Sequence, residues 1–445
     1  MKKKIVKYMW LSSVLFTTVS CGRDMVGVET LDNGRLEGET FIHNDAVARA
    51  AAVGIYNAMQ NRYVYGGEMH FFEGLFADDF IHTGTYPEFA EAGASNFLDI
   101  NLSLRRIFGG HYAVIRTCNI IIDQVETRPV PETAITEPVK KQVLGEAYAG
   151  RALMHFNLTR LFGDVAYVTT PVYKADEVIT PARDSQHLVY ESIVKDLKKS
   201  AEFFKQNDHK SKTFLNLDAA QVLLAKVYME MKLFDEAKLL LESIKGYSLA
   251  PSYPTLFSVS GSPEEDIFKI NFTNTDGGKQ ASFFYPAAVG GIGEVSLRDT
   301  FITIFSADDK RRMFAAAQGR NYFTKYSNPG SGADNVPVIR YADVLLSLAE
   351  CRLKTSGDAL APVNMVRARA GIAPLTTVTL EDILLERRKE LYGEADRWFS
   401  VKRSGKAKQV IESKGRPYFS QRMDLWPIPA WQLINNPKVK QNPGY

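Results

Sequence analysis

The sequence predicts a mainly α-helical fold in which helix pairs stack into a scaffold, and three stretches support this prediction. Val139–Phe162 has apolar residues at the spacing of one long amphipathic helix. Two other stretches, around residues 217–246 and 337–371, each contain two apolar-faced helices joined by a short turn. Because one such pair cannot bury its apolar face alone, neighbouring pairs gain stability by stacking. We therefore expect helical repeat units around 139–165, 217–246 and 337–371.

The stretch around 217–246 is the clearest of these units. Its apolar residues fall on one face of each of two helices: Ala220, Leu223, Leu224, Val227, Tyr228 and Met231, then Ala237, Leu240, Leu241 and Ile244. The turn between them, Lys232–Ala237, resembles the turn of a tetratricopeptide repeat. The stretch around 337–371 has the same order of apolar helix, turn with an acid-plus-Ala step, and second apolar helix. Further helices are expected at Ala46–Met59, with Asn44 as a candidate N-cap, and at Leu102–Val125 and Leu188–Phe204.

The N-terminus has the features of a targeting segment. Four lysines within residues 1–7 precede the apolar run Met9–Val19, which is too short to span a bilayer. The tetrapeptide Thr18–Cys21 is similar to a bacterial lipobox, so we expect cleavage before Cys21 and lipidation of its thiol. The alternative is an ordinary secretory signal with an incidental cysteine. The predicted organisation is a signal peptide (1–20), a lipidated flexible tether (21–40) and a single body (41–445).

The charge balance argues against nucleic acid as a partner. The chain has 54 Lys and Arg residues and 51 Asp and Glu residues. Residues 1–20 contain four of the basic residues and no acid, which leaves 50 basic against 51 acidic residues after cleavage. A protein that binds nucleic acid or an anionic membrane surface needs a large positive field, and this chain lacks one.

No pattern in the sequence indicates a metal, a cofactor or catalysis. The seven histidines show no HExxH or HxH spacing, and there is no G-x-S-x-G or Walker A motif. Asp78–Asp79 and Glu264–Glu265 are adjacent acids, which rarely face one another across a glycosidic bond. Cys118 and Cys351 lie in helical patterns and are interpreted as small buried hydrophobes, with one long-range disulfide left open.

Two stretches depart from helical periodicity. Arg62–Phe97 is crowded with aromatic residues, and Tyr247–Tyr326 is rich in Pro, Gly, Ser and aromatics. Short β-like runs are expected at Ile267–Phe272 and Ser282–Tyr285. Because 80 irregular residues are too many for a connector, the insertion around 247–326 is predicted to pack on the scaffold and bind a ligand.

A dense set of charges follows the third repeat unit, in a segment that we interpret as one helix. The charges nearly balance: Glu386, Arg387, Arg388, Glu390, Glu394, Asp396, Arg397 and Arg403. Such a set could bind an anion. Because the guanidinium fork favours buried bidentate pairing with carboxylates, a structural network that fixes this helix against the repeats is the preferred interpretation.

Three motifs in this order resemble a known family. They are Gly145–Val172, the segment with ERRKEL and DRWFSVKR, and the C-terminal LWPIPAWQLINNPKVKQNPGY. The chain resembles the SusD/RagB-like outer-membrane nutrient-binding lipoproteins of Bacteroidetes. The resemblance implies a tetratricopeptide-like scaffold with a loop-rich region packed on it, and a non-enzymatic function. It also implies a SusC-like TonB-dependent transporter as partner, to which the protein passes oligosaccharides or, in RagB-like members, peptides.

The candidate ligand-binding residues come from the two irregular stretches, where family members bind their ligands. Sugar recognition needs flat aromatic faces and nearby polar groups for the hydroxyls. The residues that combine these properties are Tyr63, Tyr65, Asp78, Asp79, Tyr86, Phe283, Tyr285, Asn321 and Tyr322.

Tryptophan is absent from both irregular stretches, because after residue 20 it occurs only at Trp398, Trp426 and Trp431, in the C-terminal family motifs. Stacking would therefore use Tyr or Phe. An oligosaccharide is the first choice of ligand, and the low Trp count gives weight to a peptide. A structural adaptor that holds a partner helix is the third hypothesis.

Overall fold

The structure is a computed structural model that describes residues 41–127, 134–174, 179–206, 210–257, 261 and 263–445. The predicted signal peptide (1–20), the predicted tether (21–40) and the predicted lipidation site Cys21 lie outside these residues.

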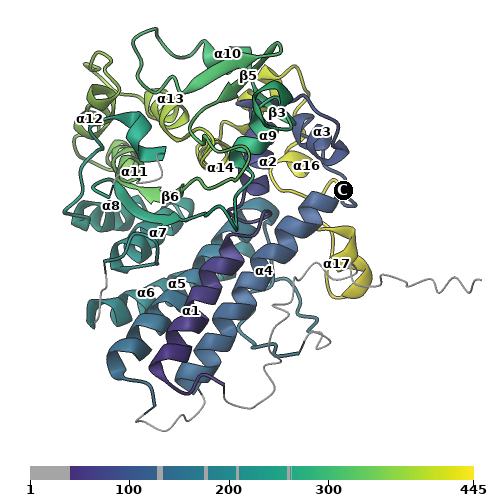
Figure 1. Cartoon of the computed structure of the whole chain (residues 1–445), viewed down its shortest axis with the longest axis vertical. Helices are drawn as coiled ribbons and strands as arrows, with labels where there is room; N and C mark the ends of the chain where they lie inside the picture. Colours follow the sequence, from purple (N-terminus) through teal and green to yellow (C-terminus); the bar gives the residue numbers. More distant parts are fainter. Residues whose placement is uncertain (1–40, 128–133, 175–178, 207–209, 258–260, 262) are drawn as a thin grey trace, which may run out of the picture.

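Long helices form one side of the molecule (Figure 1). α5 (Glu137–Phe162) contacts α4 (Leu102–Ile122) and α6 (Gln186–Gln206), and α1 (Asp45–Met59) packs on α4 and α5. The side chain of Asn44 accepts a hydrogen bond from the Val47 amide at 3.0 Å and so begins α1, as predicted. Because neighbours surround α5, most of its residues are buried and not only one apolar stripe.

Two helix pairs continue this array. α7 (Leu217–Glu230) and α8 (Phe234–Ser243) form the first pair, and α11 (Tyr341–Lys354) and α12 (Leu360–Arg369) form the second. α7 packs on α6, and α11 packs on α8, so the pairs stack. The predicted fold class, mainly α with stacked helix pairs, is confirmed.

The rest of the chain forms a loop-rich region with short elements on top of the helices. Its strands pair in three antiparallel ribbons: β1 (Phe80–His82) with β3 (Val295–Leu297), β2 (Asp266–Ile270) with β6 (Val336–Arg340), and β4 (Phe314–Ala317) with β5 (Arg320–Phe323). Its helices are short: α2 (Glu68–Phe76), α3 (Pro87–Gly93), α9 (Gln280–Phe284), α10 (Asp299–Ile302), α13 (Leu380–Leu391), α14 (Arg397–Arg403), α15 (Ala407–Ser413), α16 (Ser420–Met423) and α17 (Ala430–Asn435). Single turns of other helix types occur at Asp123–Thr127, Tyr253–Phe257 and Ala287–Val289. The β1–β3 pairing joins the two irregular stretches.

The sequence interpretation was wrong about two local elements. Ser282–Tyr285 is not a strand, because the amides of Phe283 and Tyr285 donate to the carbonyls of Lys279 and Ala281 and close the turns of α9. The charged segment is not one helix but two, α13 and α14. Gly393 at φ +74° and Ala395 at φ +55° stand between them, and the left-handed backbone breaks the helical path.

Aromatic side chains form the core where the loop-rich region meets the helices. Phe97 stacks on both Phe72 and Phe76, and all three rings contact the buried Trp426. Phe284 stacks on Phe323 at 3.8 Å between ring centroids, and both contact Phe80. This arrangement explains why Arg62–Phe97 is so rich in aromatics: most of them are structural.

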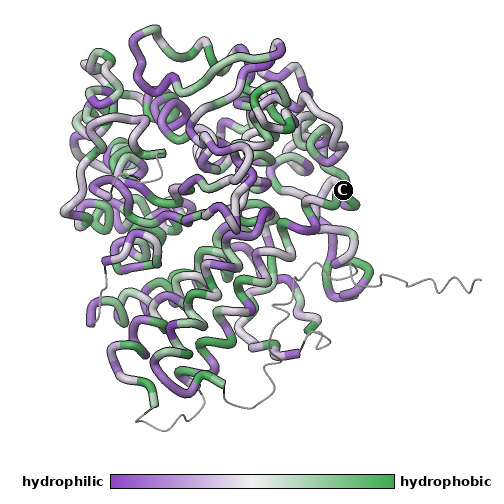
Figure 2. Tube along the Cα trace, viewed as in Figure 1, coloured by the Kyte–Doolittle hydropathy of each residue, from purple (hydrophilic) through white to green (hydrophobic). Residues whose placement is uncertain are grey.

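Figure 2 shows apolar and polar residues interspersed along the long helices. Among the described residues, no helix combines the length and the apolar character that crossing a membrane requires.

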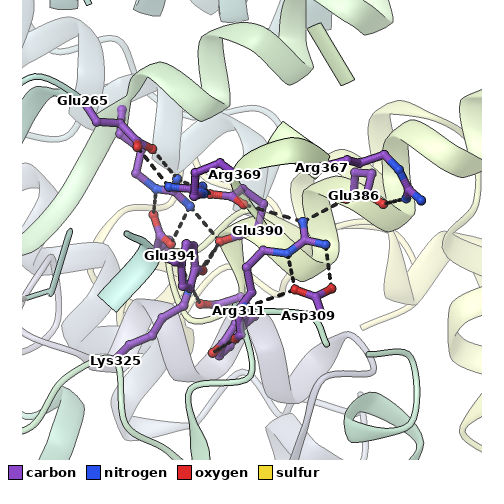
Figure 3. A network of polar contacts seen from close by, with 12 residues as sticks. Glu265, Asp309, Arg311, Lys325, Arg367, Arg369, Glu386, Glu390 and Glu394 are labelled. Carbon is purple, nitrogen blue, oxygen red and sulfur yellow. Dashed lines mark hydrogen bonds and ion pairs between the residues drawn. The ribbon is translucent and has the colours of Figure 1, made fainter. Parts of the chain in front are cut away.

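Buried ion pairs hold α13 in place. Arg340, 1% exposed, donates from Nη1 to Glu265 Oε1 at 2.8 Å and to Glu390 Oε1 at 2.5 Å, and from Nε to Glu394 Oε2 at 2.8 Å. Arg311 lies between Asp309 and Glu386, as Figure 3 shows. Burial alone would raise the pKa of Glu390, but Arg369, Arg340 and Arg311 hold that pKa well below its ordinary value.

The remaining charges of α13 and α14 connect to other elements. Arg387 pairs with Asp343 of α11 at 2.7 Å, and Arg403 pairs with Glu350 of α11 at 2.7 Å. Arg388 pairs with Asp79 beside β1 at 2.7 Å. The interpretation of these charges as a structural network is confirmed.

We predict that Arg340→Met lowers the free energy of unfolding by about 3–5 kcal/mol, because it leaves Glu265, Glu390 and Glu394 buried without their shared cation. Arg352→Ala is the matched control, since its pair with Glu242 is partly exposed and should contribute less than about 1 kcal/mol. Urea unfolding followed by circular dichroism measures both. Equal losses in the two variants would contradict the structural role of Arg340.

The buried Glu350 predicts how the free energy of unfolding changes with pH. Burial opposes ionisation of its carboxyl, but Arg403 holds the pKa of Glu350 below its ordinary value. Its contribution to stability is therefore complete above the unfolded-state pKa of about 4.3 and is lost as the pH falls through the folded-state pKa. We expect Glu350→Gln to lower the free energy of unfolding by about 3 kcal/mol at neutral pH.

The same variant should differ less from the wild type in acid, because protonated Glu350 is neutral like glutamine. Urea unfolding at neutral pH and near pH 3 measures the difference. Glu412→Gln, on a partly exposed pair with Lys408, should change neither value. A Glu350→Gln deficit that stays constant or grows in acid would refute the prediction.

Candidate functional site

The β1–β3 ribbon places residues of the two irregular stretches next to one another. Tyr86 follows β1, and Phe283 and Tyr285 lie at the end of α9, shortly before β3. The rings of Tyr86 and Phe283 meet in a T-shaped contact, with 6.1 Å between ring centroids. Residues about 200 positions apart in the sequence are thus brought together in a first aromatic group, and a second group lies within the later stretch.

The first group consists of Tyr63 and Tyr86 around the buried ring of Phe283. Arg62 links Tyr63 to Phe283, because its guanidinium lies 4.8 Å from the Phe283 centroid and 5.5 Å from the Tyr63 centroid. Arg106 lies 5.3 Å from the Tyr63 centroid and donates from Nη1 to the Tyr63 hydroxyl at 2.7 Å. The guanidinium groups of Arg62 and Arg106 therefore hold the half-buried Tyr63 ring, through cation–π contacts and one hydrogen bond.

The surroundings of Tyr63 keep its hydroxyl in the neutral, protonated form. Burial, and then the negative charge of Glu68, raise the pKa of Tyr63, so its hydroxyl is protonated and can donate. Arg62 donates from Nε to Glu68 Oε1 at 2.5 Å. Arg106 is exposed, and its guanidinium can also donate to a ligand.

Tyr86 is the most exposed aromatic residue of the site, with 38% of its surface accessible. It stands before Pro87, the first residue of α3, and its ring meets that of Phe89 in a T-shaped contact with 5.8 Å between centroids. Phe89 in turn stacks on Phe283 at 5.2 Å. A buried stack therefore supports the inner side of Tyr86, and the rest of the ring is open to a ligand.

The second group is the pair Tyr285 and Tyr322, whose ring centroids are 4.6 Å apart. Tyr285 is half-buried, and burial raises the pKa of its hydroxyl to about 12. Tyr322 is 8% exposed and supports Tyr285 from within. The side chain of the neighbouring Asn321 donates to Asp299 Oδ1 at 2.8 Å, so its amide is already engaged.

Five of the predicted site residues lie in the interior: Tyr322, described above, and Tyr65, Phe283, Asp78 and Asp79. Tyr65 is 4% exposed, and its hydroxyl accepts a hydrogen bond from Asn157. Phe283 is 1% exposed and is part of the aromatic stack.

Asp78 and Asp79 are buried in ion pairs. Asp78 accepts from Arg397 Nε at 2.8 Å, and Asp79 accepts from Arg388 Nε at 2.7 Å. Despite burial, Arg397 and Arg388 hold the pKa of Asp78 below its ordinary value. A ligand would have to break these pairs, so the structure gives the two carboxylates a structural role.

Sequence reasoning missed Arg62, Arg106 and Glu294. Arg62 adjoins Tyr63 in the sequence, and this adjacency was the available signal. Arg106 lies in a helix and Glu294 lies 208 residues from Tyr86, so no local pattern could place either of them at the site.

Two cavities in the described part of the chain contain no residue of either aromatic group. A groove of about 480 Å³ is lined mainly by apolar side chains together with Tyr247, Tyr341 and Arg369, and a small cavity of about 40 Å³ is lined by the predicted site residue Tyr65 among others. No group of three or more His, Cys, Asp or Glu side chains in the described part of the chain could hold a metal ion.

Comparisons with known proteins agree with this architecture. The SusD family matches residues 306–445, and a family described as starch-binding and associating with the outer membrane matches residues 50–229. SusD-like protein P2 of Formosa agariphila is 26% identical, over 100% of both chains.

Two solved structures are similar over most of their length. A SusD superfamily protein from Bacteroides vulgatus has a TM-score of 0.81 at 21% identity, covering 91% of this chain and 100% of that chain. Surface glycan-binding protein A from Bacteroides thetaiotaomicron, solved with laminarihexaose, has a TM-score of 0.77 at 19% identity, covering 90% and 99%. At these identities the likeness establishes the fold. Together with the two family matches and the full-length relative, it confirms the resemblance, and the chain belongs to the SusD/RagB family.

Proposed function

We propose that this protein captures oligosaccharides at the cell surface and delivers them to a SusC-like TonB-dependent transporter. The observation that carries the proposal is the first aromatic group, in which the β1–β3 pairing accompanies the contact of the exposed Tyr86 with Phe283 from a distant segment. The half-buried Tyr285, in contact with Tyr322, adds a second aromatic group two residues after Phe283. SusD-family binding proteins are non-catalytic, so the proposed activity is binding and transfer without turnover.

The chemistry of the two groups suits a sugar. An accessible tyrosine face can pack against the C–H side of a pyranose ring, and hydroxyl and guanidinium donors can bond its hydroxyl groups. Tyr86 offers the exposed ring, and Tyr63, Arg62 and Arg106 offer donors beside it. The structural neighbour solved with laminarihexaose supports this class of ligand.

The outer membrane is the proposed location. One matching family is described as associating with the outer membrane, and Cys21 is the proposed point of lipid attachment. The proposed organisation remains a signal peptide (1–20), a tether (21–40) and a single body (41–445) whose ligand site includes part of the insertion around 247–326.

A peptide is the alternative ligand, and one observation favours it. Trp398 and Trp426 are fully buried and Trp431 lies on α17, so neither aromatic group contains a tryptophan. The Arg106 guanidinium can donate to a peptide carboxylate as well as to a sugar hydroxyl.

The ligand class is tested by calorimetry with laminarihexaose, maltohexaose, xylohexaose, cellohexaose and a tryptic peptide pool. We expect a hexasaccharide to bind, and Tyr86→Ala and Tyr285→Ala each to weaken binding by about tenfold, equivalent to about 1.4 kcal/mol. Trp431→Ala is the matched control, because Trp431 is 39% exposed but lies on α17. Binding of the peptide pool alone would replace the oligosaccharide by a peptide, and unaltered binding in both tyrosine variants would remove these groups from the site.

The partner is tested by purification from native outer membranes. We expect the tagged full-length protein to recover a TonB-dependent barrel, and a Cys21→Ser variant to reach the membrane fraction in much smaller amounts. Recovery of the lipidated protein without any such barrel would refute delivery to a transporter and favour a structural adaptor.

A further inference from the structure

The Glu294 carboxylate holds the segment that presents Tyr86. It accepts from the Thr85 amide at 3.1 Å on Oε1 and 2.9 Å on Oε2, and from the Tyr86 amide at 3.0 Å on Oε2. The Thr85 hydroxyl is 3.4 Å from Oε1. Glu294 is only 4% exposed, so these bonds are shielded from water.

Other contacts of Glu294 and its neighbour fix the same segment. The Thr83 amide donates to the Glu294 carbonyl at 3.0 Å, and the Thr83 hydroxyl donates to the Gly293 carbonyl at 3.1 Å. The His82 ring lies 3.3 Å from Glu294 Oε2. Residues 82–86, which connect β1 to α3, are therefore held by contacts with Gly293 and Glu294 along almost their whole length.

Gly84 makes room for this carboxylate. A Cβ atom at position 84 would lie 2.2 Å from the Glu294 carboxylate, closer than any real contact. A side chain there would displace either the carboxylate or the loop. The fit shows that the loop and the glutamate are built around one another.

Glu294 is a poor candidate for direct contact with a ligand. Both of its oxygens already accept hydrogen bonds from the loop, and its side chain is buried. Tyr86 in contrast is exposed, and its ring meets the rings of Phe89 and Phe283 in T-shaped contacts. An exposed ring on a loop keeps its orientation only if its backbone is fixed, and hydrogen bonds to a charged acceptor are strong enough to fix it.

We propose that Glu294 is the positioning residue for Tyr86: its buried carboxylate fixes the backbone of Thr85 and Tyr86, and thereby sets the ring in the orientation that stacks on the sugar. This inference rests on the proposed function. Glu294 then governs the affinity for an oligosaccharide without touching it, because a fixed ring loses less conformational entropy on binding.

The test is a double-mutant cycle with Glu294→Gln, Tyr86→Ala and the double variant, measured by calorimetry with whichever of the four hexasaccharides binds the wild type most tightly. Glutamine keeps the shape but turns one acceptor oxygen into a donor that faces an amide. We expect Glu294→Gln to weaken binding about fivefold and Tyr86→Ala about tenfold. The double variant should bind like Tyr86→Ala to within twofold, because Glu294 has no ring left to position.

Two further variants separate positioning from general damage. Glu91→Gln is the matched control: Glu91 Oε2 accepts from the Leu98 amide at 2.9 Å and so fixes the other side of α3. It should leave affinity unchanged. Gly84→Ala keeps the charge of Glu294 but displaces its carboxylate, and it should weaken binding as Glu294→Gln does. In hydrogen exchange, the amides of Thr85 and Tyr86 should exchange at least tenfold faster in Glu294→Gln, with a global unfolding midpoint close to that of the wild type.

Each outcome bears on a different claim. If none of the four hexasaccharides binds the wild type, the proposed oligosaccharide function fails and this inference fails with it. If the wild type binds a hexasaccharide, and Glu294→Gln and Gly84→Ala both bind it as tightly as the wild type does, only the inference is overturned. A double variant weakened by the product of the two single effects, or an equal loss in Glu91→Gln, also overturns positioning through Tyr86.

Discussion

The structure depends on the compensation of charges that are buried around α13. Removing a guanidinium or a carboxylate from water is expensive, and only a well-placed partner offsets that penalty. Several arginines of this region pair with carboxylates on other elements. Arg340 brings β6 to α13, Arg387 and Arg403 bring α13 and α14 to α11, and Arg388 reaches Asp79 beside β1. The position of α13 is therefore fixed from several directions at once, and the helix pairs and the loop-rich region are joined there.

The candidate ligand site is held by a different set of contacts. The β1–β3 ribbon and the Glu294 carboxylate connect the loop before α3 to the segment after α9, and Phe89 and Phe283 form the stacked floor beneath Tyr86. The two sets meet at Asp78 and Asp79, which lie directly before β1 and pair with Arg397 and Arg388. The ion-pair network around α13 and α14 therefore fixes the start of β1, and the position of β1 determines the position of Tyr86.

The sequence was most informative where neighbours in the chain decide the structure. Periodicity placed α1, α4, α5, α6 and the pairs α7–α8 and α11–α12, and Asn44 marked the start of α1, because helical contacts are local. It was least informative where partners are far apart. Asp78 and Asp79 looked like ligand groups until their arginines, about 310 residues away, were known. Tyr63, Tyr86 and Tyr285 could be proposed from residue type alone, whereas Glu294 could not, because a buried carboxylate that serves a distant loop leaves no local pattern. The strand expected at Ser282–Tyr285 had the aromatic composition of a strand, yet its backbone bonds close within α9.

The buried ion pairs around α13 and the exposed Tyr86 lie in different parts of the fold, and this separation has a consequence for the evolution of such proteins. Tyr86 is 38% exposed and its ring contributes few contacts to the interior, whereas Arg340 and Glu390 are almost completely enclosed. We therefore expect the fold to tolerate substitutions at Tyr86 better than substitutions at Arg340 or Glu390. Under the proposed function, a lineage can then change its ligand through a few loop residues and keep an architecture that a solved structure of only 21% identity shares.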